Sequence, residues 1–206
     1  MPLPTPLLAP GDDIVEVARR ALDHAEVDLA PSDILVVCES PLAITQGRLV
    51  DIDDLHPGLA ARVLCRLFSS EGSLANPYGM QLAIDEAGLA RIALALVAGA
   101  AGRLVGRRGD FYRVAPRQVA WIDDMTGTMP PYSQHIILGP VDPEGVARRL
   151  ADTLGCAAAI VDANDLGRVE VLGCSPGTDR DVLVATMRSN PQGNDDEQTP
   201  LVLVRT

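Results

Sequence analysis

The sequence predicts an α/β fold in which helices pack on a mixed sheet, with an α+β arrangement as the alternative. Apolar residues make up 47% of the 206 residues, which is enough for a buried core. Short continuous apolar runs, such as residues 33–38, are typical of interior strands, and they come irregularly between segments with helical spacing. Because no internal repeat or low-complexity linker divides the chain, we expect residues 1–206 to form a single unit, with two intertwined subdomains as the open alternative.

Helices are predicted where apolar residues recur every three or four positions, because this spacing gives one buried face. The segments with this spacing, or with matching end signals, are residues 14–22 after Asp12 or Asp13, residues 57–70, residues 80–105, residues 142–155 and residues 179–188. An aspartate suits an N-cap, and Asp142-Pro143 adds a proline at the first helical position. Glycines such as Gly99 in the long helix allow another element to approach closely, either inside the chain or at a subunit interface.

Strands are predicted where short apolar runs, rich in β-branched or aromatic residues, lie between turn residues. These runs are residues 33–38, 111–114, 118–122, 136–138, 156–161, 169–172 and 201–204. Residues 1–10 are rich in proline and are expected to be extended. The irregular alternation of these strands with the helices is the reason to expect a mixed sheet.

The charge of the chain excludes several kinds of site. All 17 cations are arginine, and no lysine occurs. A Walker-type phosphate loop and a Schiff-base site both require a lysine, so both are excluded. The net charge of −11 would repel phosphate backbones, so we expect no general nucleic-acid binding.

The cysteines and the apolar runs indicate a cytoplasmic protein. The four cysteines show no CxxC spacing, which favours free thiols in a reducing compartment. The first residues carry no basic region and are broken by prolines, unlike a signal peptide. The most apolar run, residues 92–102, is shorter than the roughly 20 residues that a bilayer span needs, so we expect no membrane association.

Three polar loops lie next to predicted strands and carry several oxygen-bearing side chains. The first polar loop, residues 123–135, carries Asp123, Asp124, Thr126 and Thr128; the second, residues 162–168, carries Asp162, Asn164 and Asp165; the third, residues 190–200, carries Asn194, Asp195, Asp196 and Glu197. Such oxygens bind hard cations such as Mg²⁺ or Mn²⁺, often beside substrate phosphates. Open α/β sheets also bind ligands beyond the carboxyl ends of their strands. For each loop taken alone, turns and caps remain an equally open role.

Three further residues are candidate ligand contacts. His135 is the one histidine in a polar loop, so it is a candidate contact to substrate or metal, with a structural role as the alternative. Arg107 and Arg108 follow the long predicted helix and are able to bind phosphate or carboxylate bidentately. The alternative is that these two arginines stabilise the helix, because positive charge interacts favourably with the negative end of the helix dipole. No catalytic residue is assigned, and Ser133 lacks the context of a hydrolase nucleophile.

Five segments in order along the chain carry a family resemblance. They are Pro10-Gly-Asp-Asp13, residues 33–37 leading to Gly47-Arg48, Gly139-Pro-Val-Asp-Pro143, the second polar loop ending in Gly167-Arg168, and residues 200–205. Together they resemble the coenzyme F-420-0:L-glutamate ligase, or γ-glutamyl ligase, family over nearly the whole chain. Residues 76–80, 123–136 and 190–200 resemble a divergent bacterial branch described as folate-metabolism γ-glutamate ligases.

The resemblance implies a γ-glutamyl-ligase-like fold and a reaction that joins L-glutamate to the carboxylate of a small-molecule substrate. It implies GTP or ATP as co-substrate, Mg or Mn as the metal, and a homodimer. By position, Asp124 or Asp123 falls near the first metal-binding aspartate of the family, and Asp162 or Asp165 falls near the second. The remaining candidates of the loops, with His135, are then nucleotide- or substrate-binding residues.

The chain also departs from the family pattern. Members of the family place a Ser-Lys pair and a further lysine after the first strand, in the nucleotide site, where this chain has Glu39-Ser40 and Ile44. Members of the family also have an arginine soon after the Gly-Arg pair, where this chain has Val169-Glu170-Val171 after Gly167-Arg168. The nucleotide site is therefore either rebuilt with arginines or lost. The alternative function is a non-catalytic homologue that binds a metal or another ligand.

Overall fold

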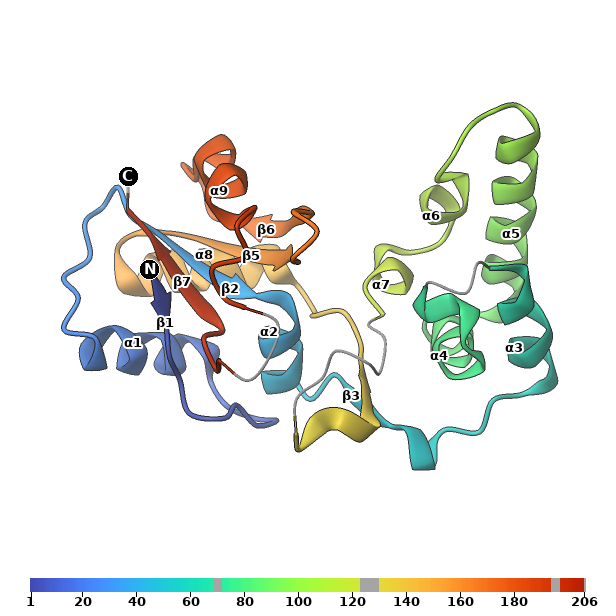
Figure 1. Cartoon of the computed structure of the whole chain (residues 1–206), viewed down its shortest axis with the longest axis horizontal. Coiled ribbons are helices and arrows are strands. Elements are labelled where there is room, and N and C mark those ends of the chain that lie inside the picture. Colours follow the sequence, from blue (N-terminus) through green and yellow to red (C-terminus); the bar gives the residue numbers. More distant parts are fainter. Residues whose placement is uncertain (69–71, 123–129, 194–196, 206) are drawn as a thin grey trace. The chain divides into compact units, whose positions relative to one another are not determined.

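The structure is a computed structural model that describes residues 1–68, 72–122, 130–193 and 197–205. The chain divides into two compact units (Figure 1). Unit 1 consists of Met1–Arg48 and Pro140–Thr206, and unit 2 consists of Leu49–Gly139. Unit 1 is thus built from both ends of the sequence, and unit 2 is inserted between them. The prediction of one unit with two subdomains as an alternative stays a prediction.

Unit 1 is built around a five-stranded mixed sheet, which confirms the predicted α/β class. Its strands, in spatial order, are β1 (Pro2–Leu3), β7 (Leu201–Val204), β2 (Ile34–Cys38), β5 (Ala157–Ala163) and β6 (Val169–Cys174). Strands β2 and β5 are parallel, and the other neighbours are antiparallel. All five residues of β2 are buried, as expected for a continuous apolar run at the centre of a sheet.

Helices cover both faces of this sheet. They are α1 (Ile14–His24), α2 (Glu39–Thr45), α8 (Pro143–Leu154) and α9 (Arg180–Met187). Leu183 and Met187 of α9 pack with Ile34, Val36 and Val202 of the strands on one face. Helix α8 packs on β5 and β6, and it lies behind the sheet in Figure 1. Because alternate strand residues face opposite sides, the sheet is buried between two helical layers.

The helix ends of unit 1 follow the predicted capping signals. Asp13 accepts a hydrogen bond from the Val15 backbone N–H at 3.0 Å and begins α1. Asp142 accepts a hydrogen bond from the Gly145 backbone N–H at 3.0 Å and begins α8. Helix α2 was not predicted from the sequence, because its seven residues, Glu39–Thr45, follow an apolar strand directly and are too few to show a helical period.

Unit 2 is mainly helical. Its helices are α3 (Leu59–Leu64), α4 (Pro77–Ala87), α5 (Leu89–Leu104), α6 (Asp110–Val114) and α7 (Arg117–Ala120). Short 3₁₀ turns cover Ile52–Asp54, Cys65–Leu67, Ser73–Ala75 and Tyr132–Gln134, and a two-stranded antiparallel sheet pairs β3 (Leu49–Asp51) with β4 (His135–Ile137). One apolar cluster that includes Met80, Ile92, Phe111 and Val119 forms its core.

Two predicted strands of unit 2 are wrong. Residues 111–114 and 118–122 fall in α6 and α7 and their ends. Phe111 and Ala115 are buried, whereas Arg113 between them is exposed, so burial recurs every four residues as on a helix face and not every two residues as on a strand face. Runs of four or five apolar residues fit either period, so the sequence did not discriminate between them.

The predicted helix over residues 80–105 is two helices. Gly88 adopts φ +81° between α4 and α5, a conformation that favours glycine and ends the first helix. A Cβ at Gly99 would lie 3.1 Å from the Cβ of Phe111 in α6. The close approach at Gly99 is therefore between helices inside unit 2.

The four cysteines are free thiols, as predicted, and three of them are buried. Among the helices in the described part of the chain, none combines the length and apolar character needed to cross a membrane.

Candidate functional site

Three segments of unit 1 meet at one edge of its sheet. Parallel strands β2 and β5 end at the same edge, and β7 begins there because it runs antiparallel to β2. The Cys38 backbone N–H donates to the Pro200 carbonyl at 3.0 Å, which joins the end of β2 to the third polar loop. The second polar loop follows β5 directly. The sheet edge therefore brings together chain segments that lie far apart in the sequence.

The second and third polar loops contact each other through side chains. Asn190 Nδ2 donates to Asp165 Oδ1 at 2.6 Å, and Gln192 Nε2 donates to the Ala163 carbonyl at 3.2 Å. Thr199 Oγ1 donates to the Gln192 carbonyl at 2.6 Å, which closes the third loop on itself. Asn190 is only 7% exposed. Asn190 and Gln192 were not among the predicted site residues, although the polar character of their loop pointed to this segment.

Asn164 has a structural role in the second loop. Its Oδ1 accepts hydrogen bonds from the backbone N–H groups of Leu166 at 3.1 Å and Arg168 at 3.2 Å. Those bonds form a turn between β5 and β6, which is the alternative that the sequence left open. The side-chain oxygen of Asn164 is thereby engaged within its own loop.

Asp162 lies at the end of β5, with Glu170 of β6 as its cross-strand neighbour. Its side chain is exposed in a strand whose other central residues are buried. Burial, and then the nearby charge of Asp162, raise the pKa of the Cys38 thiol to about 12. Cys38 is therefore a neutral thiol at pH 7 and not a nucleophile, since the thiolate is the reactive form.

The positions of the missing family lysines lie just beyond β2. Glu39 and Ser40 begin α2, and both are half-buried. Ile44 of the same helix is 8% exposed and packs in the core of unit 1. An apolar side chain that is buried in this way offers nothing to a phosphate group.

Part of the predicted site falls outside the described residues. Those predicted residues are Asp123, Asp124, Thr126, Thr128, Asn194, Asp195 and Asp196. Glu197 is described, and its carboxylate lies against the backbone of Gly193 in the same loop.

The other candidates belong to unit 2. His135 begins β4 opposite Asp51, and its ring packs edge-on against Tyr132 with centroids 5.8 Å apart. Its Nδ1 is buried and has no hydrogen-bond partner among the described residues. A buried polar atom is rarely left unpaired, so its partner is a water, a ligand or a residue outside the described ranges. Arg107 contacts Asp110 Oδ1 at 3.3 Å, and Arg108 is exposed.

The donor groups of the second loop have the chemistry of a divalent-metal site. Carboxylate oxygens are the ligands that Mg²⁺ and Mn²⁺ prefer, and Asp162 is exposed at a strand end. Asp165 uses Oδ1 in its bond to Asn190. Within the described residues, no group of three or more His, Cys, Asp or Glu side chains is close enough together to hold a metal ion. A complete site would need ligands from outside those residues.

Comparison with known proteins identifies one family. The model of the F420-0:gamma-glutamyl ligase family matches residues 2–161. No curated protein sequence matches the chain. The matched region ends one residue before Asp162, so the second and third polar loops lie beyond it.

Proposed function

Because the chain belongs to the F420-0:gamma-glutamyl ligase family, we propose that it is an acid–amino-acid ligase. It uses GTP or ATP to join L-glutamate to the carboxylate of a small-molecule substrate. The family match over residues 2–161 is the observation that carries this proposal. The free cysteines are in keeping with activity in the cytoplasm.

The proposed reaction has two steps. A carboxylate oxygen of the substrate attacks the γ-phosphorus of the nucleotide, and the nucleoside diphosphate leaves. The α-amino group of glutamate then displaces phosphate from the acyl phosphate, which forms the amide and releases one proton. Catalysis of this type depends mainly on positioning and on the neutralisation of negative charge.

We assign Asp162 and Asp165, with Asp123 and Asp124, to the divalent metal. Bound there, Mg²⁺ or Mn²⁺ would neutralise charge on the phosphate groups. The exposed carboxylate of Asp162 and the bond that holds Asp165 to Asn190 support the part of this assignment that falls in the second loop. Because the buried Nδ1 of His135 has no partner in the part of the chain that the structure describes, we assign this residue to substrate binding. Thr126, Thr128, Asn164, Arg107, Arg108 and residues 194–197 complete the proposed nucleotide and substrate contacts.

Titration of Mn²⁺ by calorimetry tests the metal assignment. We expect Asp162→Asn combined with Asp165→Asn to weaken Mn²⁺ binding at least tenfold, because both carboxylate charges are lost. Asp152→Asn is the control, since Asp152 is an exposed carboxylate of α8 in the same unit. Equal binding heats for the double variant and the wild-type protein would contradict the assignment.

Release of inorganic phosphate from GTP or ATP tests the ligase activity. The ligase proposal predicts phosphate release that depends on both glutamate and a carboxylate acceptor. Candidate acceptors are screened in parallel, and mass spectrometry of the product identifies the new amide, an N-acylglutamate, by the added mass of one glutamate residue.

The second candidate function is a non-catalytic homologue that binds a ligand. Two features favour it: Ser40 and the buried Ile44 stand at positions where the family has lysines, and the acidic Glu39 lies beside them. A specific ligand of the folded state raises the melting temperature by linkage. Stabilisation by GTP or ATP with Mg²⁺ would support the ligase, and no shift with either nucleotide would support the non-catalytic homologue.

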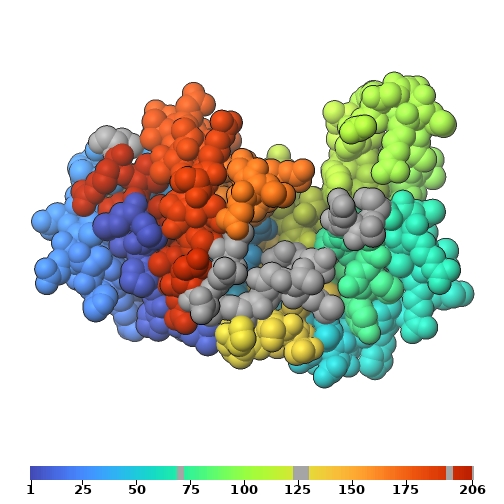
Figure 2. Space-filling model, viewed as in Figure 1, coloured from blue at the N-terminus to red at the C-terminus, as the bar shows by residue number. Residues whose placement is uncertain are grey.

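We also propose a homodimer that pairs through the exposed face of α5. Leu94, Val97 and Leu104 are 60%, 67% and 89% exposed, and with Ala101 they follow the alternating four-and-three spacing of a helix–helix seam. The yellow-green surface of this region forms one end of unit 2 (Figure 2). We expect Val97→Glu to convert a dimer to a monomer in light scattering, whereas Leu166→Glu, at an exposed position of unit 1, leaves the mass unchanged.

A further inference from the structure

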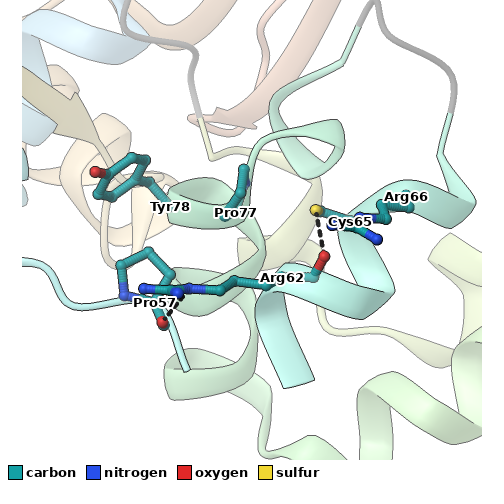
Figure 3. A pocket seen from close by; sticks show the side chains of 6 residues that line it. All are labelled: Pro57, Arg62, Cys65, Arg66, Pro77 and Tyr78. Atoms are coloured by element: carbon teal, nitrogen blue, oxygen red, sulfur yellow. Dashed lines mark hydrogen bonds between the residues drawn. The ribbon is translucent and has the colours of Figure 1, made fainter. Parts of the chain in front are cut away.

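Unit 2 contains a cavity that the ligase proposal does not use. Its volume is about 340 Å³, within the size range of small-molecule sites. Six residues line it: Pro57, Arg62, Cys65, Arg66, Pro77 and Tyr78. They come from the segment before α3, from α3 and the turn after it, and from the beginning of α4 (Figure 3). Three short segments therefore converge on one hollow.

Two arginines give this cavity its charge. Arg62 and Arg66 lie four residues apart, and neither forms an ion pair with a carboxylate in the described part of the chain. Elsewhere, Arg113 pairs with Asp110 and Arg148 pairs with Glu144. In a chain with a net charge of −11, two neighbouring arginines without a carboxylate are a local excess of positive charge.

One of the two guanidinium groups is held in place by the backbone. Arg62 Nε donates to the Pro57 carbonyl at 3.0 Å, as the dashed line in Figure 3 shows. This bond uses one of the five N–H groups of the side chain and leaves both Nη atoms available. A guanidinium oriented in this way is suited to bidentate binding of a carboxylate or phosphate group.

The beginning of α4 adds to the positive potential. Pro77 and Tyr78 are its first two residues, and α4 has 11 residues. The positive end of the helix dipole therefore lies at the cavity wall. Asn76 Oδ1 accepts from the Tyr78 backbone N–H at 2.9 Å, so that donor is already used and a ligand would feel only the field. The prolines and the Tyr78 ring provide an apolar surface beside the charges.

We propose that this cavity binds a small organic molecule through an oxyanion, either a carboxylate or a phosphate group. Arg62 binds the oxyanion, Arg66 adds positive charge on the other side of the hollow, and Tyr78 with Pro57 and Pro77 contacts the apolar part of the molecule. The site lies wholly within unit 2 and needs neither nucleotide nor metal. Its test is therefore independent of the ligase activity.

Titration of the full chain with phenyl phosphate and with benzoate tests the site, because the two probes share a ring and differ in the oxyanion. We expect saturable binding of at least one of them. Arg62→Gln combined with Arg66→Gln should weaken it at least tenfold. The matched control is Arg103→Gln combined with Arg117→Gln, which removes the same charge from exposed positions of the same unit and should change the affinity less than twofold.

Each result has a defined meaning. Tighter binding of phenyl phosphate assigns the site to phosphate esters, and tighter binding of benzoate assigns it to carboxylates; both uphold the proposal. Absence of saturable binding, or an equal loss in the control variant, overturns it. Arg66→Gln alone serves if the double variant fails to fold, because no described backbone bond depends on Arg66; it should weaken binding by about threefold or more.

Discussion

The two units bury their apolar side chains in different ways. In unit 1, a central strand is covered on both faces, and every residue of β2 is buried. In unit 2, short helices surround a smaller cluster, and large apolar side chains remain at the surface, including Leu59, Leu67, Val97 and Leu104. Exposed apolar residues in such number favour contact with a partner or ligand. We conclude that unit 1 is the more self-sufficient part, and that unit 2 has the surfaces available for association.

The largest loss of stability is expected from a cavity made in the five-stranded sheet of unit 1. Leu35 of β2 is 0% exposed, so we expect Leu35→Ala to lower the free energy of unfolding by about 3 kcal/mol. Leu59→Ala makes the same chemical change at a side chain of unit 2 that is 79% exposed and lies outside the proposed dimer seam, and it should cost less than about 0.5 kcal/mol. Urea unfolding followed by circular dichroism measures both. Similar losses for the two variants would remove the contrast.

A smaller effect is expected where backbone segments of unit 2 approach closely. A Cβ at Gly79 would lie 3.0 Å from the Ser73 carbonyl carbon and nearer still to its oxygen, so Gly79→Ala should destabilise unit 2 by about 2 kcal/mol. At Gly109 the space is open and only the left-handed conformation, with φ +84°, opposes a side chain, so Gly109→Ala should cost about 1 kcal/mol. Thermal unfolding would contradict this ranking if Gly109→Ala proved the more harmful change.

The pH dependence of stability gives a test at the central strand of unit 1. Burial raises the pKa of Cys38 to about 12 in the folded protein, whereas an unfolded thiol loses its proton near pH 9.0. Above pH 9 the unfolded state therefore binds fewer protons than the folded state, and stability falls as the pH rises, by at most about 1.4 kcal/mol per pH unit. Below pH 8 this thiol contributes no slope.

Urea unfolding between pH 8 and pH 10.5 measures that slope. We expect Cys38→Ala to reduce the slope above pH 9, because the thiol that gains its proton on folding is gone. The Val36→Ala variant serves as the comparison, because it makes a cavity in the same strand without removing a titrating group, and it should keep the slope of the wild-type protein. An unchanged slope in Cys38→Ala would show that other groups cause the dependence.

The smallest expected effect concerns the first helix. Asp13→Ala removes the side-chain acceptor at the beginning of α1 and should cost about 1 kcal/mol. If the two units unfold in separate steps, calorimetry should show a shift only in the transition of unit 1. Asp23→Ala, on the exposed side of α1, is the control and should leave the transition within about 0.5 kcal/mol of the wild-type value.

The sequence predicted most of unit 1 and less of unit 2, for a physical reason. A buried parallel strand is a continuous apolar run, so β2 and β5 were recognisable, and Asp142-Pro143 marked the start of α8. Short helices such as α6 and α7 carry too few apolar residues to reveal their period.

The candidate site was predictable only in part. The polar composition of the second and third loops identified them as candidates, but the bond from Asn190 to Asp165 joins residues 25 apart and depends on the path of the chain. The cavity around Arg62 and Tyr78 was not predicted, because it arises from the packing of α3 on α4.

The place of β7 in the sheet has a consequence for biosynthesis. Residues 201–204 lie between β1 and β2, although they follow every other strand in the sequence. A nascent chain that has reached residue 200 thus presents β2 with one hydrogen-bonding edge unfilled, while all of residues 49–139 has already been synthesised. We expect unit 2 to acquire its structure on the ribosome first. The five-stranded sheet of unit 1 should form completely only after residues 201–204 emerge from the exit tunnel.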